Sequence, residues 1–266
     1  MPEAEITLTE LPIVERPSVA ELHERFVSCG EPVRIRGAID HWPALGRWSP
    51  ADFVARFGDV QASAYAMKAG RIMLDRAVGF RLVQLSLREY VATLDREPGA
   101  PSLYLRTKLG DVLPELLREI EIPRYCAGRP ALRHNLWFSG AGTISSLHFD
   151  LPHNLVAQVH GRKRFYLFSR AESDNLYPGR WLSSTPHLAR VDPEHPDYAR
   201  FPRLRRARGY VCTLEPGDML FIPSRVWHHA SSVTTSISTN FWWATATLYP
   251  FVRLSDLYKR VRGLNI

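Results

Sequence analysis

The sequence predicts a mainly β protein with flanking helices, in which a β-sandwich or jelly-roll barrel follows a helical N-terminal lobe. Two observations favour this class. Helix-capping patterns occur before residue 100, whereas after Tyr104 short apolar runs alternate with glycine and proline. Short strands between such turn residues, with helices at their flanks, are typical of two packed β-sheets. The 266 residues, of which 45% are hydrophobic, are enough to bury a sizeable core.

The N-terminal lobe is predicted to contain an extended start, one short strand and three helices. The opening ITLTELPIVER has an extended pattern, and residues 32–36 form the strand. A serine stands where each helix is expected to begin, and Glu21, three residues after Ser18, gives a capping-box pattern. The predicted helices run from Ser18 to Val27, from Ser49 to Gly58 and from Ser86 to about Leu94.

The β-rich region is predicted to hold a series of short strands separated by turns. They lie near residues 134–138, 144–150, 154–159, 164–168, 210–214, 218–222 and 235–243. The apolar runs 155–159 and 165–168, joined by His160-Gly161, have the pattern of a hairpin whose second strand starts near Lys163.

Three regions follow from these elements. We expect a helical and mixed N-terminal lobe over 1–100, a barrel over 101–248, and a C-terminal helical segment over 249–266. Inside the barrel, Pro216-Gly217 fits the centre of a type II turn, and Pro223 ends the buried strand that comes next.

The composition narrows the class of protein. The formal charge of +7 favours anionic partners, such as an acidic peptide, RNA or an anionic cosubstrate, without choosing among them. The three cysteines contain no CxxC pair, so neither a zinc knuckle nor a disulfide framework is indicated. No apolar run approaches the roughly 18 residues of a membrane span, and the acidic start is unlike a signal peptide. We therefore expect a cytoplasmic protein without membrane contact.

Two stretches carry residues suited to metal binding. SSLHFDLPHNLVAQVHGRKRFYLF places His148 and Asp150 two residues apart at the head of an apolar run, so both side chains face one way on a strand. Asn154 has the same parity if no bulge intervenes. The stretch LEPGDMLFIPSRVWHHASS places His228 and His229 after a buried strand. If His148 points inward, Lys163 is expected across the barrel from it.

Two imidazoles and one carboxylate suit a non-haem ferrous ion. They occupy three positions and leave three open for a bidentate cosubstrate and dioxygen. A structural zinc site would instead close its coordination sphere, usually with thiolates. An HxD pattern by itself arises by chance in many chains, so the assignment depends on the order of several motifs.

The segments HFD, NLVAQVHGRKRFYLF, EPGDMLFIPSRVWHH and STNFWW, in that order, resemble the JmjC/cupin-like Fe(II)/2-oxoglutarate-dependent oxygenases. The likeness is greatest to the small hydroxylases of that group, such as the asparaginyl hydroxylase of hypoxia-inducible factor and the hydroxylase of wybutosine in tRNA. With EPVRIRGAIDHWPALGRWS it spans roughly residues 30 to 245. The resemblance implies a double-stranded β-helix barrel, the jelly-roll of the cupins, with Fe(II), 2-oxoglutarate and O2 as cofactor and cosubstrates.

The resemblance also implies roles for individual residues. The iron ligands would be His148, Asp150 and His228, with His229 as the competitor for the third place. Lys163 would pair with the distal carboxylate of 2-oxoglutarate. Residues that would hydrogen-bond the cosubstrate or line its site are Tyr104, Ser145, which stands where threonine is expected, Asn154 and Asn240. Trp137 and Trp242 would form walls, Trp227 would pack, and His153 and His160, beside turns where exposed histidines are common, receive no role.

Composition supports a special place for Lys163. The chain has 34 basic residues, and only four of them, at positions 68, 108, 163 and 259, are lysines. A chain that otherwise uses arginine has kept a compact ammonium here, where a guanidinium fork is harder to fit. The alternative is a solvated lysine in a turn.

The substrate is not decided by the sequence. We favour hydroxylation of an amino-acid residue in a protein or peptide, with a tRNA base as the alternative and a small metabolite as a further one. The arginine-rich segment 192–211 would guide an acidic peptide or a phosphate backbone, or be a solvated loop. A non-catalytic metal-binding module stays open as well. The C-terminal Leu254, Leu257, Val261 and Leu264 have helical spacing and predict either a homodimer contact or a helix folded on its own barrel.

Overall fold

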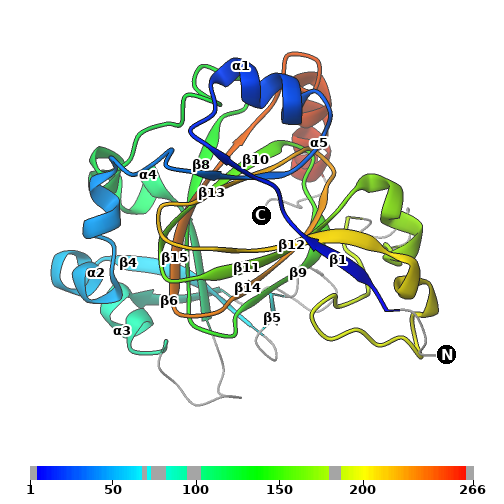
Figure 1. Ribbon diagram of the computed structural model, residues 1–266. Helices are drawn as coiled ribbons and strands as arrows, with labels where there is room; N and C mark the ends of the chain where they lie inside the picture. Colours follow the sequence, from blue (N-terminus) through cyan, green and yellow to red (C-terminus); the bar gives the residue numbers. More distant parts are fainter. Residues whose placement is uncertain (1–4, 68–70, 73–81, 95–102, 180–186, 262–266) are drawn as a thin grey trace.

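The computed structural model describes residues 5–67, 71–72, 82–94, 103–179 and 187–261, and its main feature is two β-sheets packed face to face (Figure 1). In the six-stranded sheet the order is β1 (Thr7–Glu10), β12 (Arg208–Leu214), β11 (Lys163–Phe168), β14 (Trp227–Ser232), β9 (Ile144–Phe149) and β5 (Arg71–Ile72). In the nine-stranded sheet it is β2 (Ile13–Glu15), β3 (Val33–Arg36), β13 (Met219–Ile222), β10 (His153–His160), β15 (Ser236–Trp243), β8 (Arg133–Ser139), β7 (Leu103–Lys108), β4 (Gln61–Ala66) and β6 (Leu82–Ser86).

From β8 to β15 the chain passes repeatedly between the two sheets. Strands β8, β10, β13 and β15 belong to the larger sheet, and β9, β11, β12 and β14 to the smaller one. Every pairing among these eight strands is antiparallel. This is the strand pattern of a jelly-roll. The predicted mainly β fold with flanking helices is therefore confirmed.

Short helices surround the barrel, with their bounds as follows. They are α1 (Val19–Leu22), η1 (His23–Val27), η2 (Pro43–Gly46), α2 (Pro50–Phe57), α3 (Leu87–Val91), α4 (Leu109–Val112), η4 (Pro114–Arg118), η5 (Arg170–Asn175), η6 (Pro202–Arg206) and α5 (Tyr249–Val261). Helices α2 and α3 lie on one side of the barrel, and the segment around η5 and η6 lies on the opposite side (Figure 1).

The predicted helix starts are confirmed by their caps. The hydroxyls of Ser18, Ser49 and Ser86 each accept a hydrogen bond from the backbone N–H three residues on, and the last two form complete capping boxes. Such caps satisfy N–H groups that the first helical turn leaves without a partner. The first helix continues into a π-helical turn, and the third ends at Val91, earlier than predicted.

The largest apolar core lies between the nine-stranded sheet and the N-terminal helices. Phe138 of β8 is fully buried and meets the rings of Phe53 and Tyr90, at centroid distances of 5.4 and 5.2 Å. Because side chains alternate along a strand, the neighbours of Phe138 point into the barrel instead. The outward face of this sheet is thus apolar, and its inward face is free to be polar.

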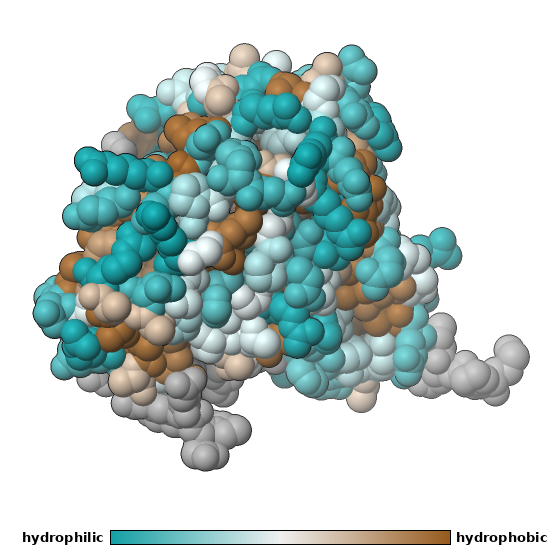
Figure 2. Space-filling model, turned by 60° about the vertical axis from the view of Figure 1, so that its left-hand side comes forward, coloured by the Kyte–Doolittle hydropathy of each residue, from teal (hydrophilic) through white to brown (hydrophobic). Residues whose placement is uncertain are grey.

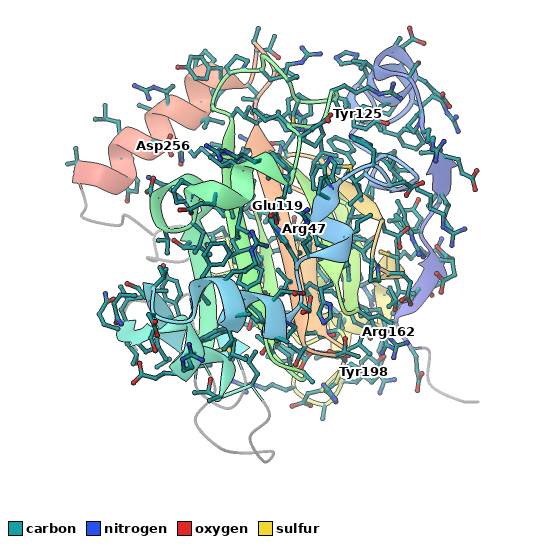
Figure 3. The ribbon with its side chains drawn as sticks, turned by 90° about the vertical axis from the view of Figure 1, so that its left-hand side faces the viewer. Arg47, Glu119, Tyr125, Arg162, Tyr198 and Asp256 are labelled. Atoms are coloured by element: carbon teal, nitrogen blue, oxygen red, sulfur yellow. The ribbon has the colours of Figure 1, made fainter. Side chains whose placement is uncertain are left out.

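One buried carboxylate joins several of these covering segments. Glu119 is buried, and its carboxylate accepts a hydrogen bond from the indole N–H of Trp48 at 2.8 Å. It also forms an ion pair with Arg56 at 2.6 Å. Arg47 approaches the same carboxylate at 3.6 Å, and Figure 3 shows the two side chains side by side. A buried charge is tolerated only with such partners.

A separate apolar cluster covers the outward face of the six-stranded sheet. Trp227 of β14, Leu147 of β9 and Phe168 of β11 pack against Phe201 and Leu204, which belong to the segment around η6. Trp227 packs as predicted, and its indole N–H donates to the hydroxyl of Ser173 at 3.0 Å. Both sheets are therefore covered on their outer faces.

The predicted hairpin at His160-Gly161 is wrong. β10 and β11 belong to different sheets, so the chain turns a corner there rather than folding back on itself. Gly161 has φ +66°, and a Cβ on it would lie 1.9 Å from the carbonyl oxygen of Thr235. The buried amide of Gln158 donates to the carbonyls of His160 and Gly161 at 2.7 and 2.9 Å, which holds the corner. As a result Lys163 shares a sheet with His148 and does not lie across the barrel from it.

Other elements were missed or confirmed in part. Strands β4 and β6 lie in the region predicted as helical and mixed, where they extend the larger sheet, and β14 was not predicted at all. The turn at Pro216-Gly217 is confirmed, because the N–H of Asp218 donates to the carbonyl of Glu215 at 3.0 Å and Gly217 has φ +97°. The division of the chain at residues 100 and 248 stays a prediction.

The C-terminal helix α5 carries apolar residues on its surface. Its most exposed large hydrophobic side chains among the described residues are Phe251, Leu254, Leu257, Tyr258 and Val261. On the face shown in Figure 2, by contrast, apolar residues form small separate patches among hydrophilic ones. Within the described residues, no helix is both long and apolar enough to cross a membrane. The cytoplasmic location stays a prediction.

Candidate metal and cosubstrate site

Pairing of β9 with β14 brings the predicted metal ligands together. His148 and His228 are direct antiparallel partners, and their ring centroids lie 4.2 Å apart. Asp150 follows the end of β9, and its Oδ2 is 3.8 Å from His228 Nε2. One ligand atom from each of the three residues can be chosen so that all lie within 4.8 Å of one another. A β-bulge on β9, next to this pair, helps to aim the side chains.

Backbone carbonyls orient both imidazoles. The Nδ1 of His148 lies 2.7 Å from the carbonyl oxygen of Ser146, and the Nδ1 of His228 lies 3.1 Å from that of Val226. A carbonyl oxygen can only accept, so each ring carries its proton on Nδ1 and has a lone pair on Nε2. This is the arrangement in which histidine binds a metal.

The electrostatics of His228 also suit a metal ligand. Burial, and next the adjacent His148 ring, lower the pKa of His228 to about 4. The imidazole is therefore neutral near pH 7, and a metal does not have to displace a proton from it. The carboxylate of Asp150 is held in place by the indole N–H of Trp242, which donates to Oδ2 at 3.0 Å. Two imidazoles and a carboxylate fit a ferrous ion with open coordination positions.

Lys163 is buried on the inward side of the six-stranded sheet. It is only 5% exposed, and burial lowers the pKa of its ammonium to about 8. Its Nζ lies 3.4 Å from the hydroxyl of Ser238 and 5.8 Å from the centre of the Tyr104 ring. Among the described residues it has no carboxylate partner. The structure therefore excludes the solvated-turn alternative and leaves a buried cation in need of an anion.

Tyr104 and Ser145 lie next to Lys163. Tyr104, on β7, is buried, and burial raises the pKa of its phenol above the usual range, while a hydrogen bond with the Ser145 side chain acts in the opposite direction. Ser145 stands on β9, opposite Ala230 of β14. Two strands from different sheets thus meet beside the ammonium.

Asn240 and Asn154 form a hydrogen-bonded pair on the larger sheet. The amide of Asn240 donates to Asn154 Oδ1 at 2.9 Å, and its own oxygen accepts from the indole of Trp137 at 2.7 Å and the amide of Asn135 at 3.1 Å. Trp137 in turn contacts Tyr104, with ring centroids 5.5 Å apart. All five residues predicted for the cosubstrate therefore line one contiguous interior.

Histidines outside the triad have structural places. His229 points away from the triad and lies with its Nε2 3.5 Å from Glu194 Oε2, so it does not compete for the metal. His153 was expected to be exposed, but it is buried, where its Nδ1 accepts the N–H of Ser224 at 3.1 Å and its ring stacks on that of Phe221. His160 is partly buried at the corner between the sheets.

Sequence reasoning missed two residues of this interior. Ser238 precedes Asn240 by two positions on β15, so strand periodicity alone would have placed it on the same face. Arg106 follows Tyr104 by two positions on β7, so it is placed on the face of Tyr104 in the same way. Its guanidinium lies 5.1 Å from the ring centre of Trp137 and 5.2 Å from that of Trp242.

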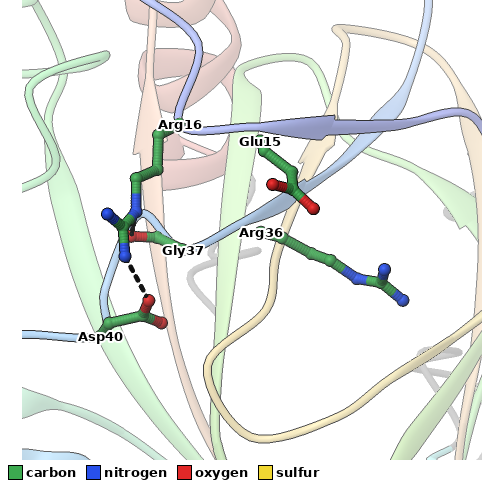
Figure 4. A pocket seen from close by; sticks show the side chains of 5 residues that line it. All are labelled: Glu15, Arg16, Arg36, Gly37 and Asp40. Atoms are coloured by element: carbon green, nitrogen blue, oxygen red, sulfur yellow. Dashed lines mark hydrogen bonds and ion pairs between the residues drawn. The ribbon is translucent and has the colours of Figure 1, made fainter.

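A hollow lies away from this interior, at the ends of the paired strands β2 and β3, and is lined by Glu15, Arg16, Arg36, Gly37 and Asp40 (Figure 4). Both of its arginines already have carboxylate partners. Arg16 binds Asp40 at 2.8 Å, and Arg36 approaches Asp218 at 3.9 Å. We assign the hollow no role.

Comparison with known proteins identifies the family. The model of the cupin-like domain family matches residues 19–248. The chain therefore belongs to the cupin-like domain family, and the resemblance to JmjC/cupin-like oxygenases seen in the sequence is confirmed.

Several curated proteins are similar to most of the chain. Lysine-specific demethylase 8 of Xenopus tropicalis is 35% identical over 89% of this chain, which spans 53% of that protein. Jumonji C domain-containing protein 5 of Drosophila melanogaster is 31% identical over 88% of this chain, which spans 60% of it. The bifunctional peptidase and (3S)-lysyl hydroxylase JMJD7 of Homo sapiens is 26% identical over 94% of this chain, which spans 89% of it. The chain thus covers little more than half of the first two relatives.

Replacement of a triad residue tests the metal site. We expect Asp150→Ala and His228→Ala each to weaken Mn(II) or anaerobic Fe(II) binding at least about hundredfold, because each removes one of three ligands. Isothermal calorimetry measures the affinity. His160→Ala, which removes a partly buried histidine away from the triad, is the matched control and should bind like the wild type. Wild-type affinity in either triad variant would contradict the site.

Proposed function

We propose that this protein is an Fe(II)- and 2-oxoglutarate-dependent dioxygenase that hydroxylates an amino-acid residue of a protein or peptide. The observation that carries the proposal is the conjunction of two features in one barrel interior. A 2-His-1-carboxylate set lies on the six-stranded sheet, and a buried ammonium without a carboxylate partner among the described residues lies two strands away. The first suits a ferrous ion, and the second suits a dicarboxylate.

In this proposal His148, Asp150 and His228 hold the iron. When bound together, ferrous iron, 2-oxoglutarate and dioxygen supply an oxidant that inserts one oxygen atom into a C–H bond, with succinate and carbon dioxide as the other products. The protein's part is to position these groups and to exclude water. The carbonyls behind both imidazoles and the indole of Trp242 behind Asp150 keep the three ligands in place.

Lys163 would bind the distal carboxylate of 2-oxoglutarate. A buried ammonium with only a distant hydroxyl is poorly solvated, and an anion beside it restores the lost interaction. Tyr104, Ser145, Asn154 and Asn240 would line the same site. They already form two hydrogen-bonded pairs, Asn240 with Asn154 and Tyr104 with Ser145, so the cosubstrate meets walls that are largely ordered before it binds.

A protein or peptide substrate is favoured over a tRNA base. The names of the relatives refer to lysine-specific demethylation and lysyl hydroxylation, which are reactions on amino-acid residues. The arginine-rich helix η6 is the feature that would serve RNA, but its Arg203 and Arg205 stack on the rings of Tyr177 and Tyr198. The three ligands and the buried lysine argue against a non-catalytic binding module.

We also propose that α5 joins two copies of the chain. A contiguous row of exposed apolar side chains marks an interaction surface, and a second copy offers the identical row, which pairs with itself about a two-fold axis. Asp256 of α5 is already held to its own barrel by an ion pair with Arg133, so the exposed row is presented in a fixed direction.

Succinate release tests the enzyme. Protein purified without oxygen and then given Fe(II), ascorbate, oxygen and 2-oxoglutarate is expected to release succinate, and Asp150→Ala is expected to abolish it. Peptide mixtures are then screened for the mass gain of one oxygen atom. Absence of succinate together with absence of 2-oxoglutarate binding to the metal-loaded protein would contradict the proposal and favour a binding module.

The pH dependence of 2-oxoglutarate binding tests Lys163. The Lys163 side chain has a pKa of about 8, so it is protonated at pH 7 and loses its proton as the pH rises through 8. The affinity for 2-oxoglutarate therefore falls with rising pH. Between pH 7 and pH 9 we expect a loss of roughly tenfold, measured with Mn(II)-loaded protein. The Lys163→Met variant should bind 2-oxoglutarate more weakly than the wild type at pH 7. It should not show the roughly tenfold loss of affinity between pH 7 and pH 9. A wild type that follows the same profile as the variant would show that Lys163 does not bind the cosubstrate.

Self-association is tested by a charge on the apolar row of α5. Light scattering of the wild type at micromolar concentration is expected to give the mass of two chains, and Leu254→Glu with Leu257→Glu the mass of one, because charges facing each other across the two-fold axis repel. A glutamate at the exposed Ile122, outside α5, is the control. A monomeric wild type would remove the dimer.

A further inference from the structure

Arg106 is a charged side chain in the barrel interior that the proposed reaction has not used. It projects from β7 on the face that also carries Tyr104. Its guanidinium lies in the corner between Trp137 and Trp242, whose rings are nearly perpendicular, at 85°. Among the described residues it has no hydrogen-bond acceptor and no carboxylate partner. The cation is therefore held by aromatic faces while its N–H groups stay available.

Arg106 stands next to the metal site. Trp242, one of the two rings that hold it, donates its indole N–H to the proposed iron ligand Asp150. Arg106, Trp137 and Trp242 are all partly exposed, as are His148 and Asp150, whereas Lys163 and Asn240 lie buried behind them. A group that enters from solvent therefore meets Arg106 before the buried residues.

The charge balance of the loaded site determines what Arg106 can attract. The doubly charged ferrous ion and the Lys163 ammonium offset the Asp150 carboxylate and the two carboxylates of 2-oxoglutarate. Arg106 then remains as an uncompensated positive charge beside the open side of the site. A partly desolvated cation attracts a carboxylate and repels lysine and arginine side chains.

We infer that Arg106 selects substrates with an acidic side chain at or beside the residue that is oxidised. The inference rests on the proposed function. A guanidinium fork binds a carboxylate through two parallel hydrogen bonds, and the two indole rings fix the fork before the substrate arrives. The selectivity is opposite in charge to that implied by the lysine-directed names of the relatives.

Peptide binding tests this without requiring turnover. Short peptides with blocked ends and identical random flanks are prepared as two mixtures, one with Asp or Glu at the centre and one with Lys or Arg. Each is offered to immobilised protein loaded with Mn(II) and 2-oxoglutarate, and retention is measured by mass spectrometry. We expect the wild type to retain the acidic mixture about tenfold more than the basic one.

Three variants separate the role of Arg106 from general charge. Arg106→Gln is expected to abolish the preference and Arg106→Glu to invert it. Arg203→Glu is the matched control, because Arg203 also stacks on an aromatic ring, at 4.5 Å from Tyr177, but lies on η6 outside the barrel interior. It should keep the wild-type preference. If Arg203→Glu instead lost or inverted the preference for acidic peptides, the arginine-rich segment would be the source of the selectivity and the inference would be overturned.

The remaining outcomes are also decisive. The inference is overturned if the wild type retains the two mixtures equally, or retains neither. It is also overturned if the wild type prefers the basic mixture. A parallel loss of 2-oxoglutarate affinity in Arg106→Gln would assign the guanidinium to the cosubstrate instead. Arg106-dependent retention of bulk tRNA above the acidic peptides would identify phosphate as the ligand. A protein that selects acidic peptides through Arg106 but neither releases succinate nor binds 2-oxoglutarate would lose the proposed function and keep this binding preference.

Discussion

Antiparallel pairing of β14 between β9 and β11 is the constraint on which the site depends. It sets His228 directly opposite His148 on one side and Leu167 on the other, and four residues further along it sets Ser232 opposite Lys163. The even-numbered residues of β14 face the barrel interior, so one strand determines both the place of the candidate metal ligand His228 and that of the buried lysine relative to it. A slip of one residue would turn His228 outward and bring His229 inward.

The same alternation gives β8 and β15 of the nine-stranded sheet an apolar and a polar face. Phe138 and Phe241 point outward into the core under the N-terminal helices, while Trp137 and Asn240 point inward. The outer core stabilises the sheet, so the inner face does not have to be apolar. Hydrogen bonds among Asn135, Asn154, Asn240 and Trp137 satisfy the polar groups that remain inside.

Two cations in this interior are stabilised in different ways. Lys163 is buried beside a single hydroxyl and an aromatic ring, and the cost of its desolvation appears as a pKa lowered to about 8. Arg106 is partly exposed and rests on two indole rings. Neither has a carboxylate partner among the described residues. The interior therefore suits two anionic ligands. Lys163, the deeper cation, suits the cosubstrate, and Arg106, the cation nearer to solvent, suits an acidic group of the substrate.

The sequence by itself determined the local features, because they depend on neighbouring residues. The serine caps, the strands β8 to β13 and β15 and the turn at Pro216-Gly217 were predicted from patterns a few residues long. The roles of His148, Asp150, His228 and Lys163 were predicted from the resemblance that several motifs in order carry. Tertiary structure decided the rest. β14 begins with Trp-His-His and carries serines, so it lacks the pattern of an apolar strand and forms through its two neighbours. The corner at Gly161 looks like a hairpin in sequence and becomes a change of sheet because Gln158 and the chain at Thr235 hold it. Strand periodicity places Arg106 on the face of Tyr104, but its significance arises from two tryptophans distant in sequence, and contacts of that kind exist only once the strands have paired.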